Sequence, residues 1–208
     1  MGKREFGEST ALEADGKPRL SRRLAHLSIG WTRYGELVRT WNARLNLTGT
    51  QEPNALAEIL FADAVVLAEK DVVPEGVCFV DVGAGVGAPA IPLLLERQDL
   101  SATLVEPRRN RVAFLRTVIG TLGLMDRCRV LEQRLEAAPL DGAPFDLALS
   151  RATFAPEEWL RRAVGLAPAA VVMVAGQPLP PGARLERSYR LPFSDAPRAL
   201  GVYPLPRT

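Results

Sequence analysis

The first part of the chain carries apolar side chains at helical spacing. Between residues 20 and 47 they recur every three or four positions, which predicts one or two amphipathic helices. Residues 53–69 repeat this pattern and predict a further helix. Residues 1–19 instead mix glycine with charged and hydroxyl side chains and show little periodicity, which is typical of a mobile tail. We therefore expect a tail over 1–19 and a helical extension over 20–70.

From residue 71 to residue 208 the pattern changes to short, nearly continuous apolar runs separated by helical segments. Such runs are typical of strands buried on both faces of a parallel sheet. The expected strands are 77–82, 102–106, 128–132, 145–149, 170–174 and two within 184–205, and the expected helices are 89–97, 108–122 and 156–165. This alternation predicts an α/β core over 71–208, with a doubly wound, mostly parallel seven-stranded sheet.

Composition and charge are those of an ordinary globular domain. The 208 residues are 47% hydrophobic and 24% charged, which suits one domain with one good core. No apolar run is long enough to span a bilayer and no secretory signal is visible, so we expect a cytoplasmic protein without a membrane partner. Cys78, Cys128 and His26 lack metal-ligand spacing, so we expect no metal site. The net charge of +2 permits nucleic-acid binding without indicating it.

A glycine-rich segment directly after the first expected strand is the strongest chemical signal. Asp81 is followed by Gly83, Gly85 and Gly87, and glycines at alternate positions allow a sharp turn and a close approach of a ligand. Glu106 ends the second expected strand, 19 residues after Gly87. A carboxylate at that position is the acceptor that a ribose with two free hydroxyls needs. The pattern predicts an adenosine-type cofactor across the first two strands.

The spacing of these glycines indicates which cofactor to expect. It is G-x-G-x-G rather than the dinucleotide pattern G-x-G-x-x-G, and no phosphate-binding G-x-x-x-x-G-K-[ST] segment is present. Pro89 and Pro92 remove two N–H donors from the start of the next helix, which makes it a poor phosphate cradle. The arrangement instead resembles the first motif of methyltransferases that use S-adenosylmethionine. The alternative is a tight glycine turn that binds no ligand.

Two further segments follow the third and fourth expected strands and should share one edge of the sheet. They are Arg134-Leu135-Glu136 and Ser150-Arg151-Ala152. Ligands of doubly wound sheets bind at the carboxyl ends of the strands. We expect Leu135, with Ala88, to form an apolar edge for an adenine, and Arg151 to hydrogen-bond the carboxylate of the cofactor or the acceptor. The alternatives are a surface ion pair between Arg134 and Glu136, and a plain strand-end charge at Arg151.

Several separated segments resemble one family, the bacterial 16S ribosomal RNA guanine-N7 methyltransferases, also called glucose-inhibited division protein B. The resemblance covers the chain from about residue 30 to residue 205. It rests on Trp41-Asn42-x-x-Leu45-Asn46-Leu47-Thr48, on Asp81-Val-Gly-Ala-Gly-Val-Gly with Ile91-Pro92-Leu93, on Arg109-x-Arg111-Val112-x-Phe114-Leu115, on Arg134-Leu135-Glu136, on Phe145-Asp146-x-x-x-Ser150-Arg151-Ala152, and on Leu191-Pro192. The first segment and Ser-Arg-Ala are more specific than the glycine loop.

The resemblance implies a Rossmann-like methyltransferase fold, S-adenosylmethionine as cofactor, and ribosomal RNA or the small ribosomal subunit as partner of a monomeric enzyme. Guanine N7 carries an in-plane lone pair, so methyl transfer to it needs no general base. Because Ser150-Arg151-Ala152 follows the fourth expected strand, we predict that Arg151 acts as the catalytic residue at the rim of the site. By the same resemblance the cofactor contacts are Gly83, Ala88, Leu135, Glu136 and Arg151, with Asp81, Gly85, Gly87 and Glu106 completing the pocket.

The chain departs from the family pattern on the acceptor side. Ile59 and Leu60 stand where the family has an Arg-His pair, Ala88 begins the stretch where it has Gly-Phe-Pro-Gly, and Ala175 stands where it has a lysine. Each lost cation removes a charge-assisted phosphate contact. These departures leave two alternatives open. One is a relative that methylates a small molecule in an apolar pocket formed by Ile59, Leu60 and Ala88, and the other is a cofactor-binding protein without catalysis.

The segment from Trp41 to Thr48 and several clusters of arginine keep RNA as the favoured acceptor. The arginines could contact phosphates along one surface, although each cluster could equally be a solvated helix face. The clusters are Arg19, Arg22 and Arg23; Arg108, Arg109, Arg111 and Arg116; and Arg161 and Arg162.

Overall fold

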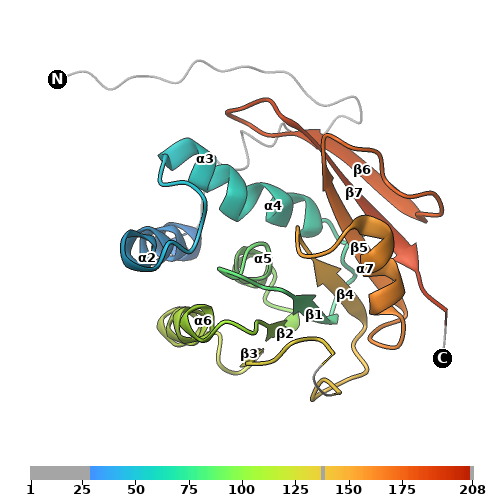
Figure 1. The fold of residues 1–208 in the computed structure, drawn as a ribbon, viewed down its shortest axis with the longest axis horizontal. Coiled ribbons are helices and arrows are strands. Elements are labelled where there is room, and N and C mark those ends of the chain that lie inside the picture. Colours follow the sequence, from blue (N-terminus) through green and yellow to red (C-terminus); the bar gives the residue numbers. More distant parts are fainter. Residues whose placement is uncertain (1–28, 137–138, 207–208) are drawn as a thin grey trace.

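The computed structural model describes residues 29–136 and 139–206, and its core is one seven-stranded sheet (Figure 1). The strand order is β3-β2-β1-β4-β5-β7-β6. The strands are β1 Cys78–Val82, β2 Ser101–Val105, β3 Cys128–Leu131, β4 Leu147–Ser150, β5 Ala169–Ala175, β6 Leu185–Arg190 and β7 Pro197–Pro204. The first five pair in parallel, and β7 runs antiparallel to both β5 and β6. The doubly wound, mostly parallel sheet expected from the sequence is confirmed.

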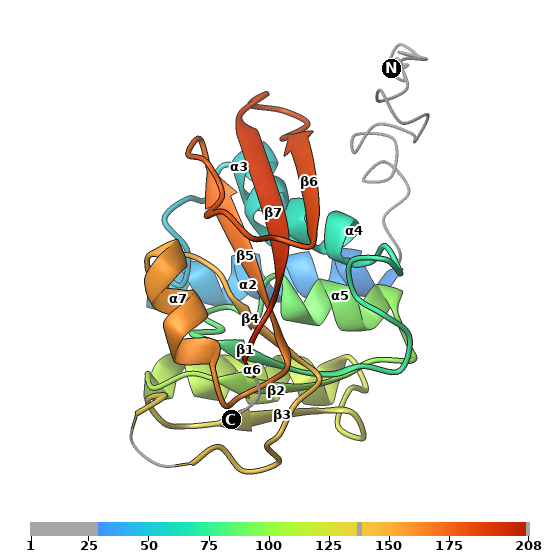
Figure 2. The same ribbon diagram turned by 90° about the vertical axis from the view of Figure 1, so that its right-hand side faces the viewer.

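Helices cover both faces of this sheet. The helical elements are α2 Ile29–Leu45, α3 Pro53–Ala57, the π-helix η1 Glu58–Ala62, α4 Asp63–Leu67, α5 Ala90–Glu96, α6 Arg109–Thr121 and α7 Pro156–Ala163. Figures 1 and 2 show α2, α4, α5 and α6 on one side of the sheet and α7 on the other. Phe79 and Leu149 belong to the larger apolar core on the first side, and Val80 and Ala148 to the smaller core beneath α7. Alternating strand residues thus fill two cores, as burial on both faces requires.

The order of the strands reverses between β1 and β4. Asp81 of β1 is paired with Leu104 of β2 on one side and with Leu149 of β4 on the other. At such a reversal the loops after the two strands diverge, which opens a crevice at their carboxyl ends. The glycine loop after β1 and the segment after β4 border this crevice.

Helix α2 packs against the glycine loop and α5. The indole Nε1 of Trp31 donates to the Pro92 carbonyl at 3.0 Å, and the Tyr34 hydroxyl donates to the Val86 carbonyl at 2.8 Å. Trp41 meets Phe114 of α6 edge to face, with ring centroids 5.5 Å apart. The helical extension therefore shares its core with the sheet and directly supports the loop at the crevice.

The segment expected as one helix over 53–69 is helical but not uniform. Glu52 accepts hydrogen bonds from two backbone amides of α3 and so caps its start. The π-helix η1 then separates α3 from α4. A π-helical turn shifts backbone carbonyls out of the regular pattern and is frequent at functional sites. The apolar period alone does not distinguish this irregularity from a regular helix.

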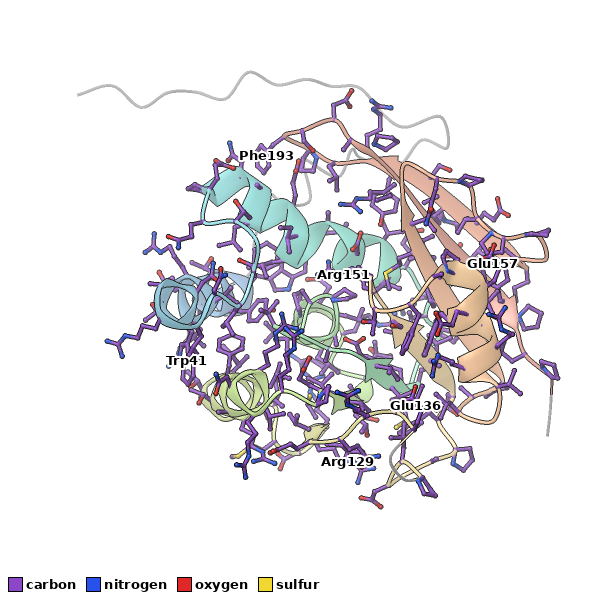
Figure 3. The ribbon with its side chains drawn as sticks, viewed as in Figure 1. Trp41, Arg129, Glu136, Arg151, Glu157 and Phe193 are labelled. Atoms are coloured by element: carbon purple, nitrogen blue, oxygen red, sulfur yellow. The ribbon has the colours of Figure 1, made fainter. Side chains whose placement is uncertain are left out.

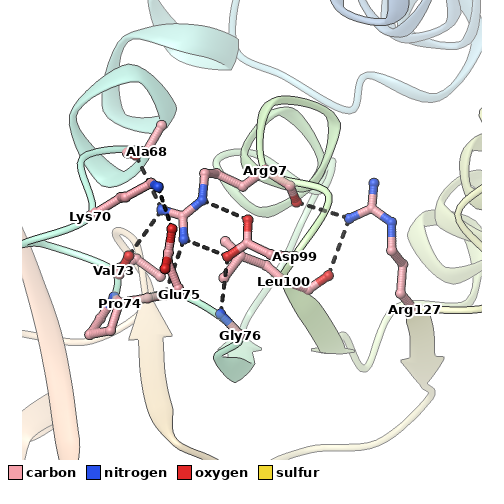
Figure 4. A network of polar contacts seen from close by, with 10 residues as sticks. All are labelled: Ala68, Lys70, Val73, Pro74, Glu75, Gly76, Arg97, Asp99, Leu100 and Arg127. Carbon is pink, nitrogen blue, oxygen red and sulfur yellow. Dashed lines mark hydrogen bonds and ion pairs between the residues drawn. The ribbon is translucent and has the colours of Figure 1, made fainter.

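A buried arginine, Arg97, lies at the amino ends of the parallel strands, which we call the amino edge of the sheet. It is 7% exposed (Figure 4). Its guanidinium donates to the carbonyls of Ala68 and Val73, at 3.2 and 3.0 Å, and forms a two-point pair with Asp99. Hydrogen bonding from Arg97 holds the pKa of Asp99 well below its usual range. Arg127 reaches the same region and donates to the carbonyl of Arg97. This network ties the ends of α4 and α5 to the loop before β1.

Several expectations concern residues outside the described ranges. The tail over 1–19, the cluster of Arg19, Arg22 and Arg23, and His26 all belong to this part of the chain. Among the described helices, none has the length and hydropathy that crossing a membrane requires.

Candidate functional site

The loop after β1 adopts a conformation that requires glycine. Gly83, Gly85 and Gly87 have φ angles of 77°, 59° and 87°, in the left-handed region that other residues rarely adopt. A Cβ atom on Gly83 would lie 2.2 Å from Oγ1 of Thr153, and one on Gly87 would lie 2.6 Å from Cγ1 of Ile91. A Cβ on Gly85 would meet nothing closer than 3.8 Å. Of the three, only Gly85 could carry a Cβ atom without a steric clash, with the Gly83 carbonyl and Nη1 of Arg111 at ordinary contact distance.

Glu106 lies where the sequence predicts it, at the end of β2, and holds the glycine loop in place. Its Oε2 accepts from the Gly85 amide and its Oε1 from the Arg108 amide, both at 2.9 Å. The residue is 2% exposed, and Nη1 of Arg111 lies 3.8 Å from Oε2. Each carboxylate oxygen can accept more than one hydrogen bond. Glu106 therefore has acceptor capacity left for a ribose hydroxyl beside Gly85.

Asp81 brings a buried carboxylate to the carboxyl end of β1. It is 1% exposed, and its Oδ2 has no hydrogen-bond partner among the described residues. Burial raises the pKa of Asp81 to about 7, the positive charge of Arg151 opposes this rise, and the negative charge of Glu106 adds to it. A buried carboxylate oxygen without a donor is unusual in folded proteins. An ammonium group reaching the crevice from the Gly85 side would supply that donor.

Arg151 follows β4 and joins the crevice to the helical extension (Figure 3). Its Nη1 donates to the Ile59 carbonyl of η1 at 2.6 Å and to Oδ2 of Asp63 at 3.0 Å. The hydroxyl of Tyr189 donates to the other oxygen of Asp63. The side chain of Arg151 is 21% exposed and that of Asp63 9%. Arg151 is thus oriented by a carboxylate and a carbonyl rather than left as a free charge at a strand end.

In the segment after β3, Glu136 forms an ion pair with Arg162 of α7. This differs from the ion pair with Arg134 that the sequence allows. Arg162 also contacts Glu158 at 2.8 Å, and its guanidinium lies 4.8 Å from the centre of the Phe154 ring. The structure therefore brings the segment after β3 next to α7.

The apolar acceptor pocket expected from Ile59, Leu60 and Ala88 is not formed by the described residues. Leu60 is 1% exposed and Ala88 5%, and both belong to the larger core. Ile59 uses its carbonyl for Arg151. The cavity next to Arg151, of about 230 Å³, lies instead at the carboxyl ends of β4 and β5 and includes Ala175 in its wall. Helix packing buries Leu60, and an apolar side chain by itself does not reveal whether it faces a core or a pocket.

The segment from Trp41 to Thr48, which carries part of the family resemblance, forms a turn held by Asn42. This turn borders a second cleft. Asn42 is 3% exposed, its Oδ1 accepts from the Thr48 amide at 2.9 Å, and its Nδ2 donates to the Thr50 carbonyl at 3.0 Å. The turn held in this way faces the start of α6. A cleft of about 390 Å³ between them is lined by Leu45, Asn46, Leu47, Arg108, Arg109, Asn110 and Arg111. The sequence contains both segments but does not show that they meet.

The residues that the sequence reasoning missed lie far from the motifs they serve. Tyr34 anchors the glycine loop, while Asp63 and Tyr189 hold Arg151. Of these residues, Asp63 could have been recognised from the sequence. A carboxylate inside the apolar run from residue 59 to residue 68 needs a buried partner. Among the described residues, no group of three or more His, Cys, Asp and Glu side chains could hold a metal ion.

Comparison with known proteins agrees with this geometry. The sequence model of one family, rRNA small subunit methyltransferase G, matches residues 30–168. The chain belongs to this family. A member from Myxococcus xanthus is 33% identical, with the alignment covering 97% of this chain and 93% of the relative.

Other relatives in the family are longer than the region they share with this chain. A ribosomal RNA small subunit methyltransferase G from Frankia casuarinae is 42% identical over 130 residues, which are 62% of this chain and 48% of the relative. The chain thus matches about half the length of that relative. Among solved structures, an S-adenosylmethionine-dependent methyltransferase from Aquifex aeolicus superposes with a TM-score of 0.51 at 18% identity, covering 70% of this chain and 90% of its own. This likeness confirms the Rossmann-like methyltransferase fold.

Proposed function

We propose that the protein transfers the methyl group of S-adenosylmethionine to N7 of a guanine in 16S ribosomal RNA. The observation that carries the proposal is the buried Oδ2 of Asp81, which has no hydrogen-bond partner among the described residues, at the end of the strand that leads into the glycine loop. It lies at the crevice where doubly wound sheets bind ligands, in a chain of the rRNA small subunit methyltransferase G family.

The residues around the crevice fit this cofactor. Asp81 offers a carboxylate for the ammonium group of the methionine part, and Glu106 offers acceptors for the ribose hydroxyls. Gly85 leaves room for the ligand, because a side chain there would extend into the crevice. We assign the remaining contacts to Gly83, Gly87, Ala88, Leu135, Glu136 and Arg151.

The chemistry requires positioning rather than proton removal. Bound S-adenosylmethionine supplies an electrophilic methyl group on a sulfonium centre. Guanine N7 is already a nucleophile, so no side chain has to act as a base. The protein has to align N7 with the methyl group and to stabilise the positive charge that develops on the base. We propose that Arg151 acts here as the catalytic residue, by orienting the acceptor or the carboxylate of the cofactor.

Arginines next to the crevice supply the RNA contacts in this proposal. Arg108, Arg109 and Arg111 border the cleft of about 390 Å³ beside the glycine loop. Helix α6 begins with these cations instead of the acidic residues that its dipole favours. Cations at the start of a helix are repelled by its dipole, and this unfavourable energy is offset if the cations bind phosphates. We propose that the protein acts in this way on the small ribosomal subunit in the cytoplasm, as a monomer.

The experiment that tests the proposal is transfer of labelled methyl from S-adenosylmethionine to small ribosomal subunits, or their RNA, that lack the modification. Label that maps to N7 of one guanine is the expected result. Normal binding of S-adenosylhomocysteine by calorimetry together with unlabelled RNA would contradict the RNA acceptor. Absence of cofactor binding at millimolar ligand would contradict methyl transfer altogether.

A further inference from the structure

A second buried polar atom without a partner lies at the same edge of the sheet as Asp81. It is Nε of Arg198, which has no hydrogen-bond partner among the described residues. Arg198 lies near the start of β7, and antiparallel pairing places it opposite Ala175, the last residue of β5. Because β5 ends at the carboxyl edge, β7 delivers Arg198 to that edge from the opposite direction.

Arg198 lines the cavity of about 230 Å³ next to Arg151. This volume is below the range of about 300–1,000 Å³ that is typical of pockets for whole small molecules. A single polar group of a larger ligand suits it better. The wall combines charged or polar groups with apolar ones, among them Asp63, Arg151, Gln177, Arg198, Phe154 and Met173.

The charged side chains around this cavity differ in how many hydrogen-bond partners they have. Asp63 already has two partners, because Arg151 donates to one of its oxygens and Tyr189 to the other. Arg151 also donates to the Ile59 carbonyl. Arg198 is therefore the cation of the cavity whose Nε–H finds no acceptor within residues 29–136 and 139–206. A guanidinium N–H in a partly apolar wall binds an anionic oxygen more strongly than it would in water.

We infer that this cavity binds a phosphate group of the RNA chain and that Arg198 is its principal donor. The inference rests on the proposed function, and it names a phosphate contact close to the target guanine. The planar fork of an arginine matches the oxygens of a phosphate. Since Arg151 lies in the same wall, a phosphate held by Arg198 places the adjoining nucleotide beside the crevice. Arg198 is thus a positioning residue for the substrate.

The test measures binding of unmodified 16S ribosomal RNA over a series of potassium chloride concentrations. Loss of one phosphate contact in Arg198→Ala should reduce the slope of log K against log salt by about 0.7–0.9. At low salt the affinity should fall about ten- to a hundredfold, as expected for a hydrogen bond to a charged group. Binding of S-adenosylhomocysteine should be unchanged, because Arg198 does not border the glycine loop.

Two further variants separate this role from a structural one. Arg190→Ala is the matched control, because Arg190 is an exposed arginine of the neighbouring β6 and pairs with Asp195. The double variant Ala175→Lys with Arg198→Ala returns a cation to the same wall from the opposite strand. Ala175 is exposed and can accept the longer side chain. We expect the lysine to restore most of the salt slope.

The outcomes distinguish the inference from the proposed function. If the wild-type protein methylates the RNA while Arg198→Ala and Arg190→Ala keep the wild-type slope, the phosphate site is wrong and the proposed function stands. A drop in melting temperature for Arg198→Ala without a change of slope assigns the residue to stability and also overturns the site. If the wild-type protein transfers no methyl group to the RNA, the proposed function fails, and the RNA phosphate fails with it.

Discussion

Buried charged groups differ in their hydrogen bonding between the two ends of the parallel strands, which are the amino edge and the carboxyl edge of the sheet. At the amino edge, Arg97 is surrounded by acceptors, and its guanidinium reaches three backbone carbonyls and a carboxylate (Figure 4). At the carboxyl edge, Asp81 and Arg198 each keep a buried atom that has no partner in the part of the chain that the structure describes. Leaving one buried group unpaired costs about 1–3 kcal/mol. The amino edge therefore contributes stability, while the carboxyl edge gives up stability and keeps donors and acceptors available to a ligand.

Among substitutions at the carboxyl edge, the largest loss of ligand binding is expected at Gly85. A leucine at this position extends into the crevice, so Gly85→Leu should lose all measurable binding of S-adenosylhomocysteine in calorimetry. Gly123→Leu is the control, because Gly123 has a similar φ of 68° and open surroundings but lies at the end of α6. It should carry the same backbone strain and bind normally. Binding by Gly85→Leu would show that the cofactor lies elsewhere.

The amino edge should respond in stability alone. Arg97→Ala removes the donor for several buried carbonyls, and the free energy of unfolding should fall by about 3 kcal/mol. Urea unfolding measures this change. Lys70→Ala breaks the neighbouring exposed pair with Glu75 and should change stability by at most about 0.5 kcal/mol. Folded Arg97→Ala that binds S-adenosylhomocysteine less tightly than wild type would contradict the division between the two edges.

Arg151 combines both situations, because it donates to a carbonyl and a carboxylate of the protein and also lines the cavity of about 230 Å³. Arg151→Ala should lower kcat about a hundredfold, the size found when a positioned donor is removed from a reacting centre. The cost in stability should exceed that of a strand-end arginine, because the pair with Asp63 is lost. Asp63→Asn weakens the same pair and keeps the guanidinium, so it should retain more activity. Near-normal kcat in Arg151→Ala would exclude the catalytic role.

The last effect is graded with pH and concerns Asp81. Its pKa of about 7 lies above the unfolded value, so the free folded protein binds the proton more tightly than the unfolded chain. The stability of the free protein should therefore fall as pH rises from about 4 to about 7, relative to Asp81→Asn. Binding of an ammonium ligand needs the carboxylate and should weaken about tenfold per pH unit below the pKa. Calorimetry that finds the same pH dependence in Asp81→Asn would assign it to another group.

Local sequence patterns were enough to predict the strands, the alternating helices and the glycine loop. Residues 71–208 carry these as local patterns, and apolar period and glycine spacing depend only on neighbours in the chain. The same local reasoning placed Asp81 and Glu106 at strand ends, where the structure has them. It also favoured a uniform helix over 53–69, where the structure contains the π-helix η1.

Which of these groups come into contact could not be predicted from the sequence and is visible in the folded molecule. Arg151 and Asp63 are 88 residues apart in the sequence, and Tyr189 and Asp63 are 126 apart. Arg198 reaches the end of β5 because β7 enters the sheet antiparallel, and Leu60 is buried because α4 and η1 pack on the core. Pairing direction and helix packing are set by the whole fold, so no local pattern reports them. The physical reason is that burial and partnership belong to the three-dimensional neighbourhood of a side chain and not to its place in the chain.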